Sequence, residues 1–167
     1  MVIDVSSILK ETGGKVNIDG GLLLNDDNVI FDGEVKVKGV VYSNGQSLTL
    51  KAECEGTLKT QCARCLKDID VNVSFPIEET LVHDDGTAVI SDDEDIILFE
   101  GYSFEIDSIV LNSFLLYTSM KYLCKEDCRG LCSSCGSDLN EGECGCNHDF
   151  VDPRWSGLAD MLNDNKE

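Results

Sequence analysis

The chain has 167 residues and a formal net charge of −19, with 42% hydrophobic residues and only 2 prolines. This length and composition are typical of one folded domain with a small appended module, and they exclude a chain that is disordered throughout. The strong negative charge disfavours generic binding to a phosphate backbone. We expect a cytoplasmic protein outside the membrane, because no apolar run could span a bilayer and no basic signal segment opens the chain.

The first half of the chain predicts a β-sheet. Residues 5–9 are a short lead-in, helical or extended, and residues 15–24 predict a strand interrupted by Gly20 and Gly21. From residue 35 to residue 75, apolar and polar side chains alternate in three runs, the first two separated by Asn44 and Gly45, a turn signal. We therefore predict an antiparallel meander with one wet face.

The same alternation assigns roles to side chains in this region. Cys54 falls on the buried face, where a cysteine behaves as a small core hydrophobe. The stretch of residues 33–67 is the one with a positive balance, +3, and could offer a surface to RNA or to another partner. Its cations are Lys36, Lys38, Lys51, Lys59, Arg64 and Lys67. A solvated sheet face is the competing interpretation of these cations and the one we prefer, which leaves direct RNA binding open.

The next stretch, residues 68–120, contains 13 carboxylates and no Lys or Arg. Residues 84–95 lack the ligand spacing of a calcium-binding loop and predict a solvated acidic loop, and residues 96–99 predict a further strand. A helix capped by Asp107 or Ser108 should pack on the sheet, because its apolar residues recur at helical spacing. Its expected core side chains are Ile109, Val110, Phe114 and Tyr117.

Nine cysteines carry the chemistry of the chain, and eight of them form four close pairs. The pairs are Cys62 with Cys65, Cys124 with Cys128, Cys132 with Cys135, and Cys144 with Cys146. An odd count without a signal segment favours metal or redox chemistry over disulfides, and four thiolates in a tetrahedron suit zinc. The segment GLCSSCG, residues 130–136, is typical of a zinc knuckle because its glycines let backbone N–H groups turn toward the sulfurs.

The four pairs can combine in three ways. Proximity in the sequence favours one site from the pairs at 132–135 and 144–146, and a second site from the pairs at 62–65 and 124–128. A single site from the pairs at 124–128 and 132–135 is the main competitor. His148 could replace one ligand of the last pair, although a surface histidine is slightly favoured.

The C-terminal end should form a last helix that begins near Pro153 and buries Trp155, Leu158 and Leu162. Together these elements predict an α+β fold: an antiparallel sheet or partly closed barrel with one packed helix and a C-terminal cysteine-rich zinc module. The predicted domains are residues 1–120 and residues 121–167.

Enzymatic functions find little support. Neither His83 nor His148 has an evident nucleophile beside it, and no phosphate-binding glycine loop is present. A redox role for the Cys62–Cys65 pair is disfavoured because the pair lies between antiparallel strands and does not open a helix, where its thiol pKa would fall. Two hypotheses remain: a binding factor with structural zinc, and a zinc-thiol redox sensor or chaperone.

Three segments resemble the YceD family: CARCL at residues 62–66, CKEDCRGLCSSCGSDLN at residues 124–140, and DPRWSGL at residues 152–158. That family comprises bacterial and plastid proteins associated with accumulation of large-subunit ribosomal RNA. The resemblance implies a non-enzymatic role in large ribosomal subunit biogenesis, with a basic ribosomal protein or an assembly particle as partner.

Overall fold

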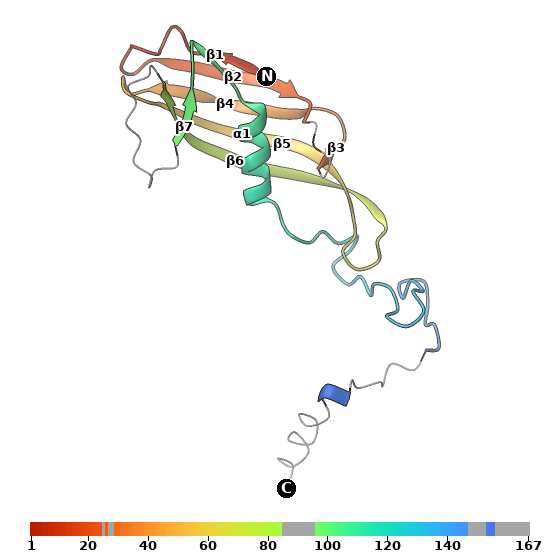
Figure 1. Cartoon of the computed structure of the whole chain (residues 1–167). Helices are drawn as coiled ribbons and strands as arrows, with labels where there is room; N and C mark the ends of the chain where they lie inside the picture. The colour runs from red at the N-terminus through yellow and green to blue at the C-terminus, as the bar shows by residue number, and fades with distance from the viewer. Residues whose placement is uncertain (25, 27–28, 85–95, 147–152, 156–167) are drawn as a thin grey trace.

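A computed structural model describes residues 1–24, 26, 29–84, 96–146 and 153–155 (Figure 1). Most of it is an open sheet in the strand order β2-β4-β5-β6-β7, with β3 paired to β5. These strands are β2 (Lys15–Leu22), β3 (Ile30–Phe31), β4 (Val35–Ser43), β5 (Leu48–Gln61), β6 (Asp68–His83) and β7 (Ile96–Phe99). The predicted α+β class is confirmed, and the sheet does not close into a barrel.

The predicted meander is confirmed and is longer than expected. β4, β5 and β6 pair in sequence order and antiparallel, and β5 and β6 stay in register from Leu48 opposite Leu81 to Gln61 opposite Asp68. Alternate side chains of β4 and β5 are buried, as period-two patterning requires. Gly20 and Gly21 lie within β2 and do not interrupt it, because each keeps its partner in β4.

Two pairings were not predicted from the sequence. β7 follows residues 84–95, of which the structure describes only Asp84, and runs parallel to the last residues of β6. The segment of residues 1–9 begins as strand β1 (Val2–Asp4), which pairs with β8 (Ser103–Glu105) in a separate two-stranded sheet. The lead-in is therefore extended at first and then turns at residues 6–10.

The helix α1 (Asp107–Tyr117) packs on one face of the sheet. Its side chains Ile109, Val110 and Phe114 are buried, and the Phe114 ring lies 5.1 Å from that of Phe31. The predicted core position of Tyr117 is wrong, because 66% of this residue is exposed.

The N-terminal cap of α1 also differs from the prediction. Ile106 occupies the cap position without a side-chain hydrogen bond, and the Asp107 carboxylate binds the amino group of Met1 instead.

The chain after α1 contains little regular structure. Residues 118–122 still lie beside β6, and the chain that follows extends beyond the end of the sheet (Figure 1), with one isolated bridge between Leu131 and Asp138. Of the segment expected to form the last helix, the structure describes one 3-10 turn, Pro153–Trp155. Trp155 is 60% exposed there, so its predicted burial is wrong. Leu158 and Leu162 lie outside the described residues.

Candidate metal centres

Eight cysteine thiols form two groups of four, one that joins the β5–β6 turn to the segment after α1 and one that lies within that segment. We call the first, formed by Cys62, Cys65, Cys124 and Cys128, the sheet-linked cluster. We call the second, formed by Cys132, Cys135, Cys144 and Cys146, the outer cluster. Within each group all sulfurs lie within 4.8 Å of one another, so each group fits a metal ion.

This grouping is the one that proximity in the sequence favours. The competing single site from residues 124, 128, 132 and 135 is not formed, because its two pairs belong to different clusters. His148, the alternative ligand, lies outside the described residues.

The sheet-linked cluster joins the turn between β5 and β6 to the chain that follows α1. The sulfur of Cys62 lies 3.7 Å from that of Cys128, and the sulfur of Cys65 lies 3.6 Å from that of Cys124. Cys62, Cys65 and Cys128 are buried. The two halves of the cluster are 59 or more residues apart in sequence. A metal ion bound here would therefore be a cross-link between distant parts of the chain.

The backbone of the β5–β6 turn prepares its thiols for a cation. The Cys62 N–H donates to the Lys67 carbonyl at 2.8 Å, and the Leu66 N–H donates to the Cys62 carbonyl at 2.9 Å. Leu66 has a φ of 59°, an uncommon value for a residue other than glycine. Burial raises the pKa of Cys62, but hydrogen bonds from the backbone N–H groups of Cys124, Cys65 and Arg64 outweigh it and lower that pKa to about 6.

Arg64 links the β5–β6 turn to residues 128–131 by hydrogen bonds. Its guanidinium donates to the Cys128 carbonyl at 2.7 Å, and its own carbonyl accepts from the Leu131 N–H at 3.1 Å. Gly130 lies against it: an added Cβ there would lie 2.9 Å from the Arg64 carbonyl oxygen, and the φ of Gly130 is 74°. Arg64 was assigned from sequence to a possible RNA surface, but its guanidinium is bonded to the protein backbone beside the sheet-linked cluster.

The outer cluster is built on the predicted knuckle. The Gly136 N–H donates to the Cys132 carbonyl at 2.9 Å, and the Ser134 N–H approaches the Cys132 sulfur at 3.4 Å. The hydroxyl and N–H of Ser137 lower the pKa of Cys135 to about 6. Cys135 is exposed, and Cys144 and Cys146 are partly exposed, so this cluster is more open to solvent than the first.

Each cluster opposes complete ionisation without a cation. Burial and the neighbouring thiols raise the pKa of Cys124 to about 12, and hydrogen bonds from Cys135 and Cys144 raise the pKa of Cys146 to about 12. Each cluster thus contains one thiol that ionises readily and one that resists adding a further negative charge. A bound metal cation removes that resistance, which is the behaviour expected of a metal site.

Asn140 is a contributor that sequence reasoning missed. Its amide donates to the Cys128 sulfur at 3.5 Å, and its carbonyl accepts from the Arg129 N–H at 2.9 Å. It therefore links the loop that follows the outer knuckle to a sulfur of the sheet-linked cluster. Its place in the run from residue 124 to residue 140 was noted, but spacing between cysteines carries no signal for such a contact.

The predicted positive surface is balanced by carboxylates across the strands. Lys36 lies opposite Glu55, Lys38 lies opposite Glu53, and Lys51 forms a 2.5 Å ion pair with Glu78. Lys59 pairs with Asp32 at 2.8 Å.

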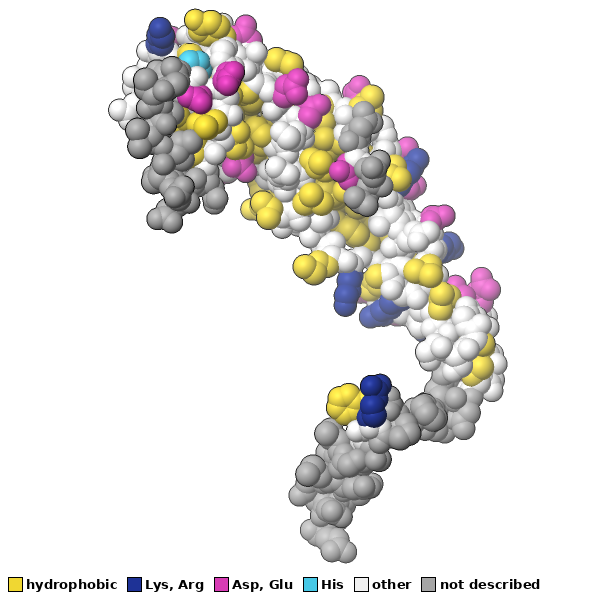
Figure 2. Space-filling model, in the orientation of Figure 1, with side chains coloured by type: hydrophobic (Ala, Val, Ile, Leu, Met, Phe, Trp, Pro, Cys, Tyr) yellow, Lys and Arg dark blue, Asp and Glu magenta, His cyan; other side chains and the backbone are white. Residues whose placement is uncertain are grey.

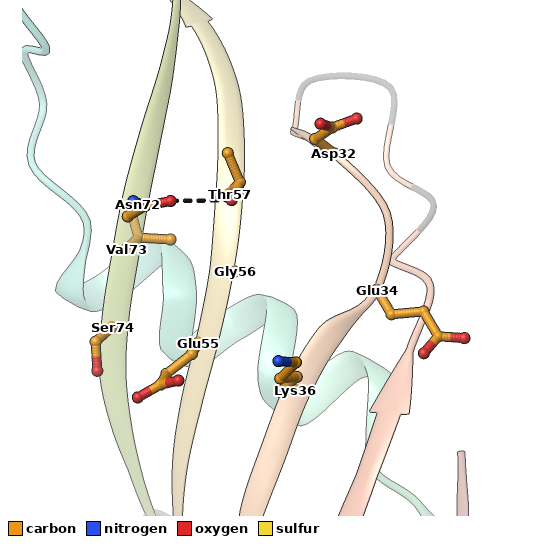
Figure 3. Close-up of a pocket in the computed structure, with 9 residues that line it drawn as sticks. All are labelled: Asp32, Glu34, Lys36, Glu55, Gly56, Thr57, Asn72, Val73 and Ser74. Atoms are coloured by element: carbon orange, nitrogen blue, oxygen red, sulfur yellow. Dashed lines mark hydrogen bonds between the residues drawn. The ribbon is translucent and has the colours of Figure 1, made fainter.

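Figure 3 shows Lys36 in a groove of about 420 Å³ on this face, between Glu34 and Glu55. Asp32 stands at its rim, and the Thr57 hydroxyl donates to Asn72 at 3.0 Å along the next two strands. The lysines therefore belong to a solvated face of mixed charge, the interpretation preferred from the sequence.

Cys54, the ninth cysteine, is a core residue, as predicted. It is fully buried, and burial raises its thiol pKa to about 12, so it stays protonated at neutral pH. We expect Cys54→Ala to destabilise the fold by about 1 kcal/mol, the cost of a small cavity, and to leave metal content unchanged. Chemical denaturation and metal analysis of the same sample would check both values; a loss of metal would contradict the core assignment.

No helix among the described residues is long and apolar enough to cross a membrane. No solved structure matches the chain. The chain is 26% identical over 142 residues to uncharacterized proteins of Mycobacterium bovis and Mycobacterium tuberculosis, and the match covers 84% of this chain. It is 27% identical over 105 residues to one of Mycobacterium leprae, covering 62% of this chain and 48% of that protein.

The chain spans 66% of the length of the Mycobacterium bovis and Mycobacterium tuberculosis relatives. The sequence pattern of one family, described as large ribosomal RNA subunit accumulation protein YceD, matches residues 50–162. That stretch includes both halves of the sheet-linked cluster and all of the outer cluster. The resemblance seen in the sequence is confirmed: the chain belongs to the YceD family.

Proposed function

We propose that the chain is a non-enzymatic factor in the biogenesis of the large ribosomal subunit, held together by two structural zinc ions. The family description links it to large-subunit ribosomal RNA accumulation. The observation that carries the structural part is the pair of four-thiol clusters. Four cysteine thiolates complete a tetrahedral zinc shell and leave no open position for a substrate, whereas catalytic zinc keeps one open.

The proposed ligands are the eight clustered cysteines, and zinc is the proposed metal because all-thiolate sets favour it in a reducing cytosol. We further propose two units, residues 1–120 and residues 121–167, joined by the sheet-linked cluster. The main support is that the buried residues of the sheet core all come from the first unit, whereas both units contribute to the separate group of buried cysteines that joins them.

The proposed partner is a basic ribosomal protein or a large-subunit assembly particle. Residues 68–120 present 13 carboxylates without one Lys or Arg, and the lysines of the preceding strands face carboxylates. Such a surface attracts cationic protein and repels a free phosphate backbone. Any contact with RNA would then occur within a particle whose proteins supply the positive charge.

Replacing Asp68, Asp70 and Glu78 with their amides should weaken binding to basic large-subunit proteins several-fold at low salt and little at high salt. The measurement is co-sedimentation of the zinc-loaded chain with large-subunit particles across a salt series. The matched control neutralises Asp127, Glu141 and Glu143, three exposed carboxylates near the clusters. A wild-type chain that binds free RNA tightly and ignores the particles would refute this proposal.

A further inference from the structure

The outer edge of β6 is open over most of its length. On one side β6 pairs with β5 from Asp68 to Leu81, but on the other side β7 pairs only with Thr80–His83. Among the residues that the structure describes, no strand covers this edge from Asp68 to Glu79. An open edge presents unpaired N–H and C=O groups that another extended chain can join.

Pro76 indicates which backbone groups face outward. It lies opposite Glu53 within the ladder, and a proline, which has no N–H, fits a strand where that position points away from the neighbouring strand. Alternate residues of an antiparallel strand bond toward the same side. The N–H groups of Asn72 and Ser74 therefore point outward with the Pro76 position, while that of Val73 points toward β5.

The C-terminal end of α1 lies over one face of the sheet beside this edge. Figure 1 shows the helix crossing the sheet so that its last turn lies at β6. Two hollows of about 230 Å³ and 250 Å³ lie between them, and Tyr117 lines both. Leu116 and Tyr117 are 81% and 66% exposed. These side chains would be covered by the inner face of an added strand.

The charge along the edge selects the kind of strand. Asp68, Asp70 and Glu78 lie on the exposed face of β6, and Glu78 forms an ion pair with Lys51. Figure 2 shows apolar side chains gathered over the middle of the molecule, while most of the acidic side chains in this view lie along its upper and right margins. An added strand that alternates apolar and basic residues would place the former under α1 and the latter beside these carboxylates.

We propose that an extended, basic segment of a partner protein joins the sheet along β6 between Asp68 and Glu79, under the C-terminal end of α1. This inference rests on the proposed function, because it gives the basic partner a binding mode. Main-chain hydrogen bonds supply affinity. Leu116 and Tyr117 contact the apolar side chains of the added strand, and the carboxylates of β6 repel acidic segments.

The probe is a synthetic twelve-residue peptide of alternating lysine and valine, titrated into the full, zinc-loaded chain. Hydrogen exchange should slow at the outward amides of residues 68–75 and remain unchanged in β2, the opposite edge strand. A peptide of the same sequence that is N-methylated at alternate residues keeps its charge and loses the backbone N–H donors along one edge. It should bind at least about tenfold more weakly, a loss of about 1.4 kcal/mol. Equal affinity for the two peptides would overturn strand addition.

Two variants locate the site. Ser74→Pro removes one outward N–H donor of β6, and Leu116→Lys places a positive charge at the end of α1, where it repels the lysines of the peptide. Each variant should bind the peptide at least about tenfold more weakly. The matched control is Leu23→Lys, which makes the same change at a residue 60% exposed near the other end of α1. Should Ser74→Pro fail to fold, Leu116→Lys, a surface change on α1, decides alone. Unchanged binding by folded Leu116→Lys would overturn the inference.

A cellular readout separates this inference from the proposed function. In cells that lack the chain, large-subunit ribosomal RNA should fall, wild type should restore it, and Leu116→Lys should restore it less well than Leu23→Lys. Equal rescue by both variants would sink strand addition and leave the proposed function standing. Unchanged ribosomal RNA in cells without the chain would sink the proposed function itself, whatever the peptide does.

Discussion

Cys128→Ser should lower the zinc content of the purified chain from two ions to one. Cys128 is 2% exposed and its sulfur lies 3.7 Å from that of Cys62, so its loss leaves three thiols in a site that closes with four. A structural zinc supplies on the order of 10 kcal/mol of folding free energy. Losing it should free the segment after α1 from the β5–β6 turn.

The measurements are native mass spectrometry for metal content and hydrogen exchange for order. Amides of residues 121–131 should exchange much faster in the variant, while those of β4 and β5 should be unchanged, because the apolar core does not include the cluster. Cys54→Ala is the matched control, since it also removes a buried cysteine. Two zinc ions retained in Cys128→Ser would contradict the proposed ligand set.

Local patterns predicted the parts of the fold that depend on local order. Period-two alternation located β4, β5 and the buried Cys54, because successive side chains of a strand face opposite sides. Close cysteine pairs predicted two knuckles, because the residues that form each knuckle are neighbours in sequence. Chain proximity grouped the two outer pairs, and the two remaining pairs were then left to form the second cluster.

The predictions that failed needed distances between remote residues. Helical spacing placed Tyr117 on the apolar face of α1 but carried no information on the width of the sheet, and the last turn of the helix reaches the β6 edge. Trp155 was predicted to be buried by a helix whose later residues lie outside the described part of the chain.

The charge of the sheet face also depends on residues that are remote in sequence. From the sequence we preferred a solvated face for the lysines of residues 36–59 but could not name their partners, because Glu78 reaches Lys51 only through the β5–β6 register. The bond from the exposed Arg64 guanidinium to the Cys128 carbonyl likewise joins residues that are remote in sequence. Cross-strand register decides whether a row of lysines is a basic patch or a neutral face.

The outer cluster should lose its zinc well before the sheet-linked cluster. Cys135 is exposed and Cys144 and Cys146 are partly exposed, whereas three cysteines of the sheet-linked cluster are buried. Chelators and oxidants need access to the sulfurs, and exposed thiols with a lowered pKa oxidise first. Under mild chelation or peroxide, zinc release should therefore occur in two phases of one ion each, with rates at least about tenfold apart.

The same experiment weighs the alternative function, a zinc-thiol redox sensor or chaperone. The apolar core of the sheet does not include the outer cysteines, so losing the first zinc should leave the binding of a hydrophobic dye unchanged. Cys135→Ser should remove the fast phase alone, and Cys128→Ser should remove the slow one. A single phase for both ions, accompanied by a large rise in dye binding, would instead favour a switch that exposes apolar surface on oxidation, because the two clusters would then open as one unit.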